Sequence, residues 1–173
     1  PKVGQDLREK AVLSIVYATI GIIIYISWRF EFKFALAAIL ALIHDITLTI
    51  GAFSILDKEF TLVVVASILT IIGYSLNDTI VVFDRIRENT RRKGKETLGS
   101  LVNMSVNQTL SRTLLTSGTT LIVVLGLFFL GGEIIHDFSF ALLIGIIVGT
   151  YSSIFIASVF LVMWEEKKSA QKK

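Results

Sequence analysis

The residues with the clearest chemical potential in this chain are charged side chains that stand in or beside apolar stretches. Asp78 lies near the end of one such stretch, in the run GYSLNDTIVVFDRIREN, and Arg112 stands at the start of the next. Ionisable groups at membrane depth are costly to bury and usually mark ion or proton pathways. Asp78 and Arg112 are therefore the first candidates for a proton-relay site.

Asp78 and Arg112 are expected to enter the membrane from the same side and at similar depth, so that their side chains can touch. A nearby arginine favours the charged form of a carboxyl group, whereas an apolar setting favours its neutral form. An aspartate beside a movable arginine can thus take up and release a proton as helices shift. The alternative is a static ion pair that only holds two helices together.

Asp45, with His44 beside it, is a second candidate site. It is interpreted either as a secondary relay group or as a packing residue that hydrogen-bonds to nearby groups, and Asn77 and Thr79 beside Asp78 allow the same two interpretations. Adjacent residues on a helix do not share a face, and no third metal ligand is evident. We therefore predict no metal site, no catalytic residue and no cofactor.

The elements that position these residues follow from the apolar composition. Apolar residues make up 53% of the 173 positions, which predicts an integral membrane protein and excludes a soluble core. About 20 helical residues cross a hydrocarbon layer about 30 Å thick. We predict an all-α fold, a polytopic membrane bundle in which residues 1–173 form one transmembrane domain. Its five transmembrane helices are expected at 11–28, 34–56, 60–83, 107–131 and 138–164.

Basic residues are distributed unevenly between the two sets of helix ends. One set carries 13 of the 17 Lys and Arg residues, including those of a predicted basic loop over 84–106: Arg29, Lys33, Arg85, Arg87, Arg91, Arg92, Lys93, Lys95, Arg112, Lys167, Lys168, Lys172 and Lys173. This set is expected to be cytoplasmic, with the N-terminus outside and the C-terminus inside. The basic side would meet lipid headgroups, and no nucleic-acid surface is predicted.

The beginning of the chain bears on this orientation. The sequence starts at Pro1, and no apolar segment precedes the first predicted helix to carry its start outward. The chain is therefore expected to lack at least one upstream helix.

The last predicted helix carries small residues at a strict spacing of four. They are Ala141, Gly145, Gly149, Ser153 and Ala157. Such a ridge lets another helix backbone approach closely, so it is interpreted as a packing surface without direct chemistry.

The helix that contains Arg112 is polar in its first half and apolar in its second half. Ser105, Thr109, Arg112, Thr116 and Thr120 are placed on one face by the helical period. A polar stripe that ends halfway through the membrane predicts a wet cavity open to the cytoplasm.

Three runs of sequence resemble one known family. They are the run around Asp78, the upstream YISWRFEFKFALAAILALIHD and the downstream LSRTLLTSGTT. They are similar to the SecF family, whose members are subunits of the SecDF protein-export complex and belong to the resistance-nodulation-division superfamily. The resemblance covers essentially the whole chain. It implies half of a resistance-nodulation-division membrane domain, without the family's first helix and extracytoplasmic domain.

The resemblance also implies roles and partners. Asp78 and Arg112 match the aspartate and arginine that the family uses for proton passage, and an aspartate of the partner SecD would complete the relay. The implied location is the bacterial or archaeal plasma membrane, in the lipid bilayer beside the SecYEG translocon. There the proton motive force drives late-stage translocation of unfolded polypeptides.

Two other classes of function compete with this interpretation. One is half of a proton-coupled transporter for a small solute or a lipid, which would need a substrate cavity beyond the polar stripe. The other is a structural subunit that stabilises SecD, with Asp78 and Arg112 as static contacts. The chain is not expected to be an enzyme in either case.

Overall fold

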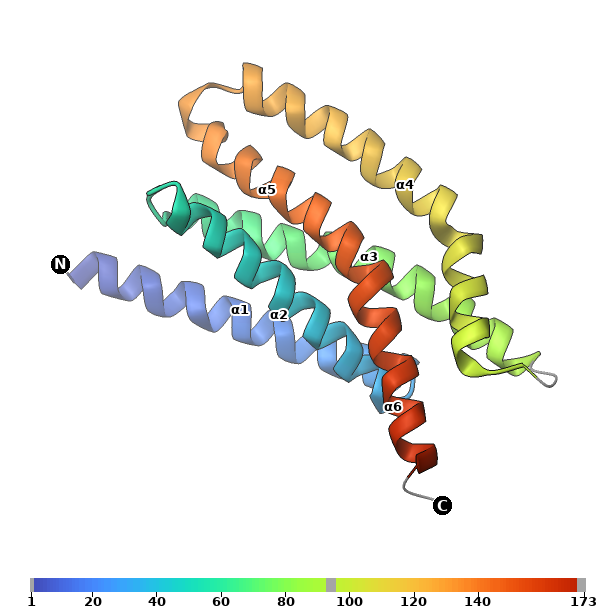
Figure 1. Cartoon of the computed structure of the whole chain (residues 1–173). Coiled ribbons are helices and arrows are strands. Elements are labelled where there is room, and N and C mark those ends of the chain that lie inside the picture. Colours follow the sequence, from blue (N-terminus) through green and yellow to red (C-terminus); the bar gives the residue numbers. More distant parts are fainter. Residues whose placement is uncertain (1, 93–95, 171–173) are drawn as a thin grey trace.

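The computed structural model describes residues 2–92 and 96–170, with side chains over 9–92 and 96–167. These residues form helices α1 (Lys2–Arg29), α2 (Phe32–Ile55), α3 (Leu62–Arg91), α4 (Leu98–Leu130), α5 (Gly132–Ser152) and α6 (Ser158–Ala170), with a π-helical segment, η1 (Ser153–Ala157), between the last two. Five helical segments are long and apolar enough to cross a membrane, as Figure 1 lets the reader follow. The predicted all-α, five-helix bundle is confirmed.

The stretch 84–106, predicted as a basic loop, is mostly helical. Helix α3 continues through it as far as Arg91, and α4 already begins at Leu98, where the Thr97 side chain accepts a hydrogen bond from the Ser100 backbone N–H at 3.3 Å. The apolar length of a segment limits only the membrane crossing, whereas Arg, Glu and Lys are good helix formers in water. The first helix likewise starts at Lys2, before the predicted residue 11.

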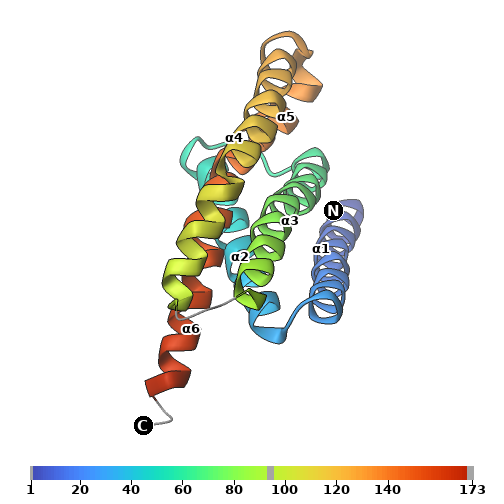
Figure 2. The same cartoon turned by 90° about the vertical axis from the view of Figure 1, so that its right-hand side faces the viewer.

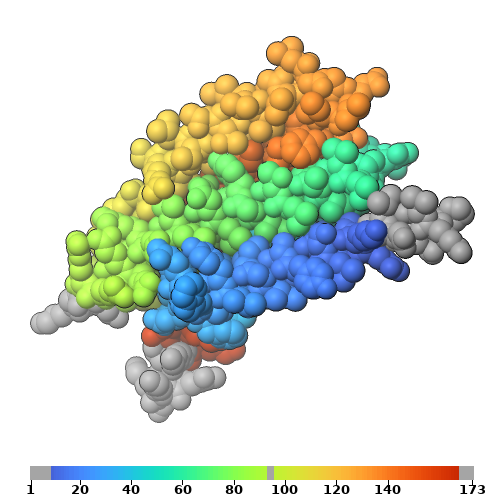
Figure 3. All heavy atoms as spheres, turned by 180° about the vertical axis from the view of Figure 1, so that it is seen from behind, coloured from blue at the N-terminus to red at the C-terminus, as the bar shows by residue number. Residues whose placement is uncertain are grey.

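Helices α3 and α5 lie at the centre of the bundle. Helix α5 packs on α2, α3 and α4, whereas α1 contacts only the α2 and α3 side. The two views in Figures 1 and 2 agree that α4 runs beside α5 and that α1 lies at the edge. Seen from behind in Figure 3, α1 lies along the surface of α3. Its outward side chains, among them Tyr17, Ile24 and Trp28, are exposed.

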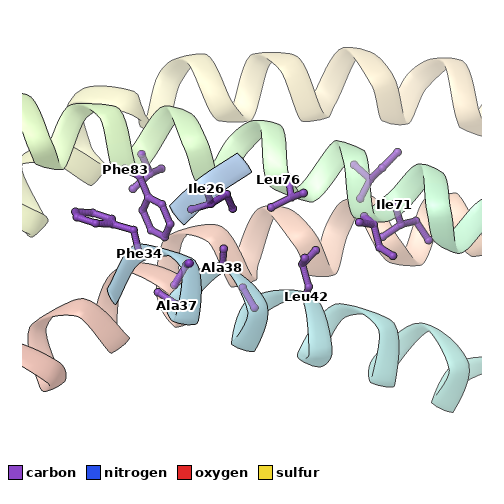
Figure 4. Packing of buried hydrophobic residues seen from close by; sticks show 14 of the residues in the cluster. Ile26, Phe34, Ala37, Ala38, Leu42, Ile71, Leu76 and Phe83 are labelled. Carbon is purple, nitrogen blue, oxygen red and sulfur yellow. The ribbon is translucent and has the colours of Figure 1, made fainter. Parts of the chain in front are cut away.

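The apolar core is continuous along the inner faces of α2, α3 and α5, and part of it is shown in Figure 4. One end of the bundle, called the basic end below, holds Arg29, Lys33 and the arginines at the end of α3. There the rings of Phe34 and Phe83 meet edge to face at 5.0 Å, and the ring of Phe30 lies 5.6 Å from that of Phe34. Edge-to-face pairs add stability beyond the area they bury. This cluster anchors the α1–α2 connection to α3.

The small residues of the last helix lie against α3. A Cβ atom added at Gly145 would collide with the Ile71 side chain, and one added at Gly149 would lie 3.1 Å from the Ser75 Cβ. One turn later, the hydroxyls of Ser153 and Thr79 are 2.8 Å apart. The ridge thus brings α5 and α3 into close backbone contact, as small-residue faces do in membranes.

The basic end holds the described members of the predicted cytoplasmic set. Arg29 pairs with Asp84 at 3.3 Å, and Glu88 pairs with Arg85 and Arg92 at 2.6 and 2.9 Å. Lys93, Lys95, Lys168, Lys172 and Lys173 lie outside the residues whose side chains are described.

Candidate functional site

Polar side chains line the seam between α3 and α4, which run antiparallel. Tyr74 donates a hydrogen bond to Thr120 at 3.2 Å near the middle of the bundle, and Asn89 donates to Ser105 at 2.8 Å near the basic end. Asp78 lies between these two pairs and contacts α4 at Ser117. The seam therefore runs from the middle of the bundle to its basic end, and Asp78 is its buried carboxyl group.

Asp78 is 3% exposed, and its Oδ2 atom lies 3.2 Å from the Ser117 hydroxyl. The Ser117 hydroxyl lies 2.7 Å from the Thr150 hydroxyl of α5, which in turn donates to the Ile146 carbonyl oxygen at 2.7 Å. The carboxyl group is thus the first member of a chain of oxygens that crosses from α3 through α4 to α5.

The number of hydroxyl protons in this chain bears on the state of Asp78. Ser117 and Thr150 supply two protons for three contacts, because each hydroxyl donates only once. Both protonation states of Asp78 can be accommodated. An ionised Asp78 accepts from Ser117, and Thr150 then donates to Ser117 in place of the Ile146 carbonyl oxygen, which keeps its helical N–H donor. A protonated Asp78 donates to Ser117, which donates to Thr150, and Thr150 donates to the carbonyl oxygen. Uptake of a proton by Asp78 would therefore reverse the direction of donation along this chain.

Arg112 is exposed and forms no ion pair with Asp78 in the described part of the chain. The predicted contact is therefore not made in this structure. The helical period explains the difference: the buried face of α4 carries Thr109, Thr113 and Ser117, which places Arg112 at the edge of the seam.

The polar stripe of α4 accordingly differs from the predicted one. Ser105 and Thr109 are buried against neighbouring helices, Thr116 and Thr120 are partly buried, and Arg112 is exposed, so the five residues do not share one environment. Thr113, one turn from Ser117, buries a hydroxyl that has no hydrogen-bond partner among the described residues.

Asp45 forms a second buried carboxyl site, between α2, α3 and α5. It is 0% exposed. Its Oδ2 atom accepts hydrogen bonds from Ser75 at 2.6 Å and from Ser152 at 2.9 Å. Its Oδ1 atom lies 3.1 Å from the His44 Nδ1. Three donors from three helices therefore converge on one carboxylate.

The hydroxyls of Ser75 and Ser152 donate to this carboxylate, and the Ser152 hydroxyl also lies 3.1 Å from the Gly149 carbonyl oxygen. The sequence analysis separated His44 from Asp45 because neighbouring residues on a helix face different ways. The structure instead places the His44 Nδ1 within 3.1 Å of the carboxylate.

The other candidate residues fall on different sides of α3. Asn77 is exposed, whereas Thr79 is buried against Ser153 of the π-helical segment. Ser153 also donates towards the Gly149 carbonyl oxygen at 2.9 Å, and Ser152 lies 3.1 Å from the same oxygen. Both hydroxyls thus contact the Gly149 carbonyl oxygen at the start of the π-helical segment. Such a local widening of a helix is often found at functional sites.

Four polar residues of these networks were not singled out by the sequence analysis: Ser75, Ser117, Thr150 and Ser152. Each is a small hydroxyl residue within an apolar helix, a type that is common in membrane helices because it hydrogen-bonds to the preceding turn. Only knowledge of which faces meet could have selected them. The described residues contain no group of three acidic or histidine side chains that could hold a metal ion.

Comparison with known proteins shows which family this chain is similar to. The family described as protein export membrane protein SecD/SecF, C-terminal, matches residues 1–167. The protein translocase subunit SecF of Desulfurispirillum indicum is 57% identical over 170 residues, covering 96% of this chain and 54% of that protein. The SecF subunit of Magnetococcus marinus is 58% identical over 165 residues, covering 95% and 53%. The chain therefore spans about half the length of the curated relatives it matches.

A solved structure has the same fold. The crystal structure of SecDF from Thermus thermophilus, described as a translocon-associated membrane protein, matches with a TM-score of 0.92 at 46% identity, over 96% of this chain and 23% of that one. The helical arrangement is thus that of a SecDF membrane domain, as the sequence resemblance implied. By the match along almost its whole length, the chain belongs to the SecD/SecF family of protein export membrane proteins.

Proposed function

We propose that this chain is the membrane part of a SecF-like subunit that couples the proton motive force to late-stage protein translocation. The observation that carries the proposal is Asp78, a carboxyl group buried at the α3–α4 seam whose hydroxyl chain to Thr150 can accommodate both its neutral and its ionised form. The curated relatives are named as protein translocase subunits. A coupling role requires proton uptake and release, and needs no catalytic residue or cofactor.

The mechanism follows from the two states of Asp78. In the neutral state, Asp78 donates to Ser117 and the oxygen chain to Thr150 is complete. In the ionised state, Asp78 accepts a hydrogen bond from Ser117, Thr150 donates to Ser117 in place of the Ile146 carbonyl oxygen, and the exposed Arg112 becomes the natural counter-ion. Movement of α4 that brings Arg112 inward would then accompany proton release. One charge crossing the membrane potential provides about 2.3 kcal/mol per 100 mV, enough to bias such a movement.

The position of Arg112 also suggests where a partner binds. An arginine at the edge of the seam can face a second subunit, and one solved relative is a SecDF protein. We infer that SecD covers this face and contributes a further carboxyl group to the relay. The SecYEG translocon and an unfolded polypeptide would complete the assembly in the plasma membrane.

Translocation in reconstituted vesicles tests this function. Vesicles that contain the full-length protein, SecD and the translocon are loaded with a stalled translocation intermediate, and an inward or outward proton gradient is imposed. Completion of translocation should depend on the gradient, on its direction and on the presence of this subunit. Equal completion with and without the subunit, at equal translocon content, would contradict the proposal.

The two buried carboxyl groups are expected to differ in function. Asp45→Asn should retain most of the proton flux, because the amide oxygen can still accept from Ser75 and Ser152 and the hydrogen bonds of Asp45 do not reach α4, which carries Arg112. It should lower the free energy of unfolding by about 1–3 kcal/mol, as the loss of a buried charged hydrogen bond does. Flux and thermal unfolding of the full-length complex measure both. Loss of flux with normal stability would instead make Asp45 a relay group.

The proposed orientation places the basic end in the cytoplasm. The chain contains no cysteine, so single cysteines report accessibility directly. Glu96→Cys, beside the start of α4, and Glu59→Cys, in the α2–α3 connection, are exposed positions at opposite ends of the bundle. In the full-length protein in intact cells, a membrane-impermeant maleimide should label Cys at position 59 and not at position 96. Labelling at position 96 and not at position 59 would show the opposite orientation in the membrane.

A further inference from the structure

A cleft opens at the basic end of the bundle, where four helices meet. It has a volume of about 130 Å³, and its walls come from the start of α2, the end of α3, the start of α4 and α6. Three of its lining residues are cationic, Lys33, Arg87 and Arg91, and one is acidic, Glu31. The cleft lies at the other end of the α3–α4 seam from the Tyr74–Thr120 pair and shares no residue with either carboxyl network.

The charges of this cleft are only partly neutralised by the protein itself. Lys33 pairs with Glu31 at 2.9 Å and with Glu165 at 4.0 Å, so its charge is compensated. Arg87 donates to the Arg29 carbonyl oxygen at 3.1 Å, a neutral acceptor that leaves its charge uncompensated. Neither Arg87 nor Arg91 forms an ion pair within the described residues. The two guanidinium groups are one helical turn apart on α3, so they stand on the same side of the helix.

The floor of the cleft is apolar. Phe34 is 5% exposed, and Ile86 and Leu161 are each 1% exposed, yet all three line the cleft. Cations above an apolar floor suit a ligand with an anionic head and an apolar body. A small inorganic anion would use the charges alone.

The depth of the cleft matches the surface of a membrane. Trp164 lies one turn beyond Leu161, and Phe32 directly precedes Lys33; both aromatic side chains are exposed. Aromatic rings gather at the level of lipid headgroups, and basic side chains extend towards them. With a volume of about 130 Å³ the cleft suits a compact group such as a phosphate, and it is too small for a helix of a protein partner, which is about 10 Å across.

We propose that this cleft, between Lys33 of α2 and Arg87 and Arg91 of α3, binds the phosphate of an anionic phospholipid headgroup. Guanidinium groups bind phosphate through two parallel N–H bonds, and basic pockets between membrane helices on this side of the bilayer hold such headgroups. A bound lipid would link α2, α3, α4 and α6 at the end of the bundle where α3 passes into α4. The proposal does not depend on proton coupling.

The test compares two neighbouring arginines in the full-length protein with its partner subunit. Native mass spectrometry in detergent, titrated with dioleoylphosphatidylglycerol, measures lipid binding. Arg91→Gln removes a charge that lines the cleft. Arg92→Gln removes the same charge one residue later, where the side chain pairs with Glu88 and does not line the cleft. We expect about fivefold weaker binding for Arg91→Gln, the effect of one basic residue near a membrane surface, and wild-type binding for Arg92→Gln.

Several outcomes would overturn the proposal, the first of which is wild-type binding of Arg91→Gln. Equal weakening by both variants would indicate diffuse surface attraction, and equal binding of dioleoylphosphatidylcholine would show that the anionic charge is not recognised. Displacement of the lipid by millimolar inorganic phosphate would identify a free-anion site. Lys33→Gln, across the cleft on α2, provides a second variant if Arg91→Gln lowers the melting temperature measured without anionic lipid. It should also weaken binding several-fold, and wild-type binding of Lys33→Gln would equally contradict the site.

Discussion

Asp78→Asn is expected to abolish proton flux through the full-length complex while leaving its assembly and melting temperature close to wild type. The amide group of asparagine can donate to Ser117 as a protonated Asp78 does, so the oxygen chain to Thr150 stays complete. The same amide cannot release a proton. The variant should therefore keep the hydrogen bonds of the neutral state and be unable to convert to the ionised state.

The measurement is proton uptake into vesicles with an imposed pH gradient, at equal complex content. Asp84→Asn is the matched control, since Asp84 lies on the same helix, is partly exposed and pairs with Arg29 at 3.3 Å outside the seam. It should retain flux. Undiminished flux in Asp78→Asn, with assembly intact, would leave Asp78 as a structural contact and refute the relay.

Much of the fold was predictable from the sequence because the membrane imposes a strong physical requirement. The number of apolar stretches long enough to span the bilayer predicts the number of membrane crossings. In lipid each backbone group must be hydrogen-bonded within its own helix, so each such stretch forms a helix. Helix ends were less predictable. The charged run after Asp78 contains good helix formers, so α3 continues to Arg91 beyond the apolar limit that marks the bilayer.

The candidate site was predictable in its carboxyl groups but not in their partners. Asp78 and Asp45 stand out because a charge in an apolar helix is rare. Ser117 and Ser152 do not, because serine within a membrane helix usually hydrogen-bonds to its own backbone and carries no signal of its neighbours. The position of Arg112 was missed for a related reason: a shift of one residue on a helix turns a side chain by about 100°, the angle that follows from 3.6 residues per turn.

The two carboxyl networks differ in the helices that they connect. Asp45 joins α2 to α3 and α5 through Ser75 and Ser152. Asp78 joins α3 to α4 through Ser117. Ser75 lies three residues before Asp78 on α3, so the contacts of Asp45 help to fix the helix that carries Asp78.

The close approach of α5 to α3 predicts a large effect of a single methyl group on stability. Gly145→Ala should lower the free energy of unfolding by about 1–3 kcal/mol, the usual penalty for overpacking, because its Cβ would collide with branched carbons of Ile71. Alanine is otherwise the better helix former, by about 0.5–1 kcal/mol over glycine. Gly51→Ala and Gly126→Ala, where nothing lies within 4 Å of the added Cβ, are therefore expected to be neutral or stabilising controls.

A double variant separates this collision from a general loss of helix packing. Ile71→Ala removes the side-chain carbons that meet the added Cβ and should by itself destabilise the core, because Ile71 is 1% exposed. Combined with Gly145→Ala, it should cost less than the sum of the two single changes, since the new methyl group fills part of the space that Ile71 leaves. Thermal unfolding of the four proteins in the full-length complex gives the coupling energy. Strict additivity would show that the ridge at Gly145 does not need the close contact with α3.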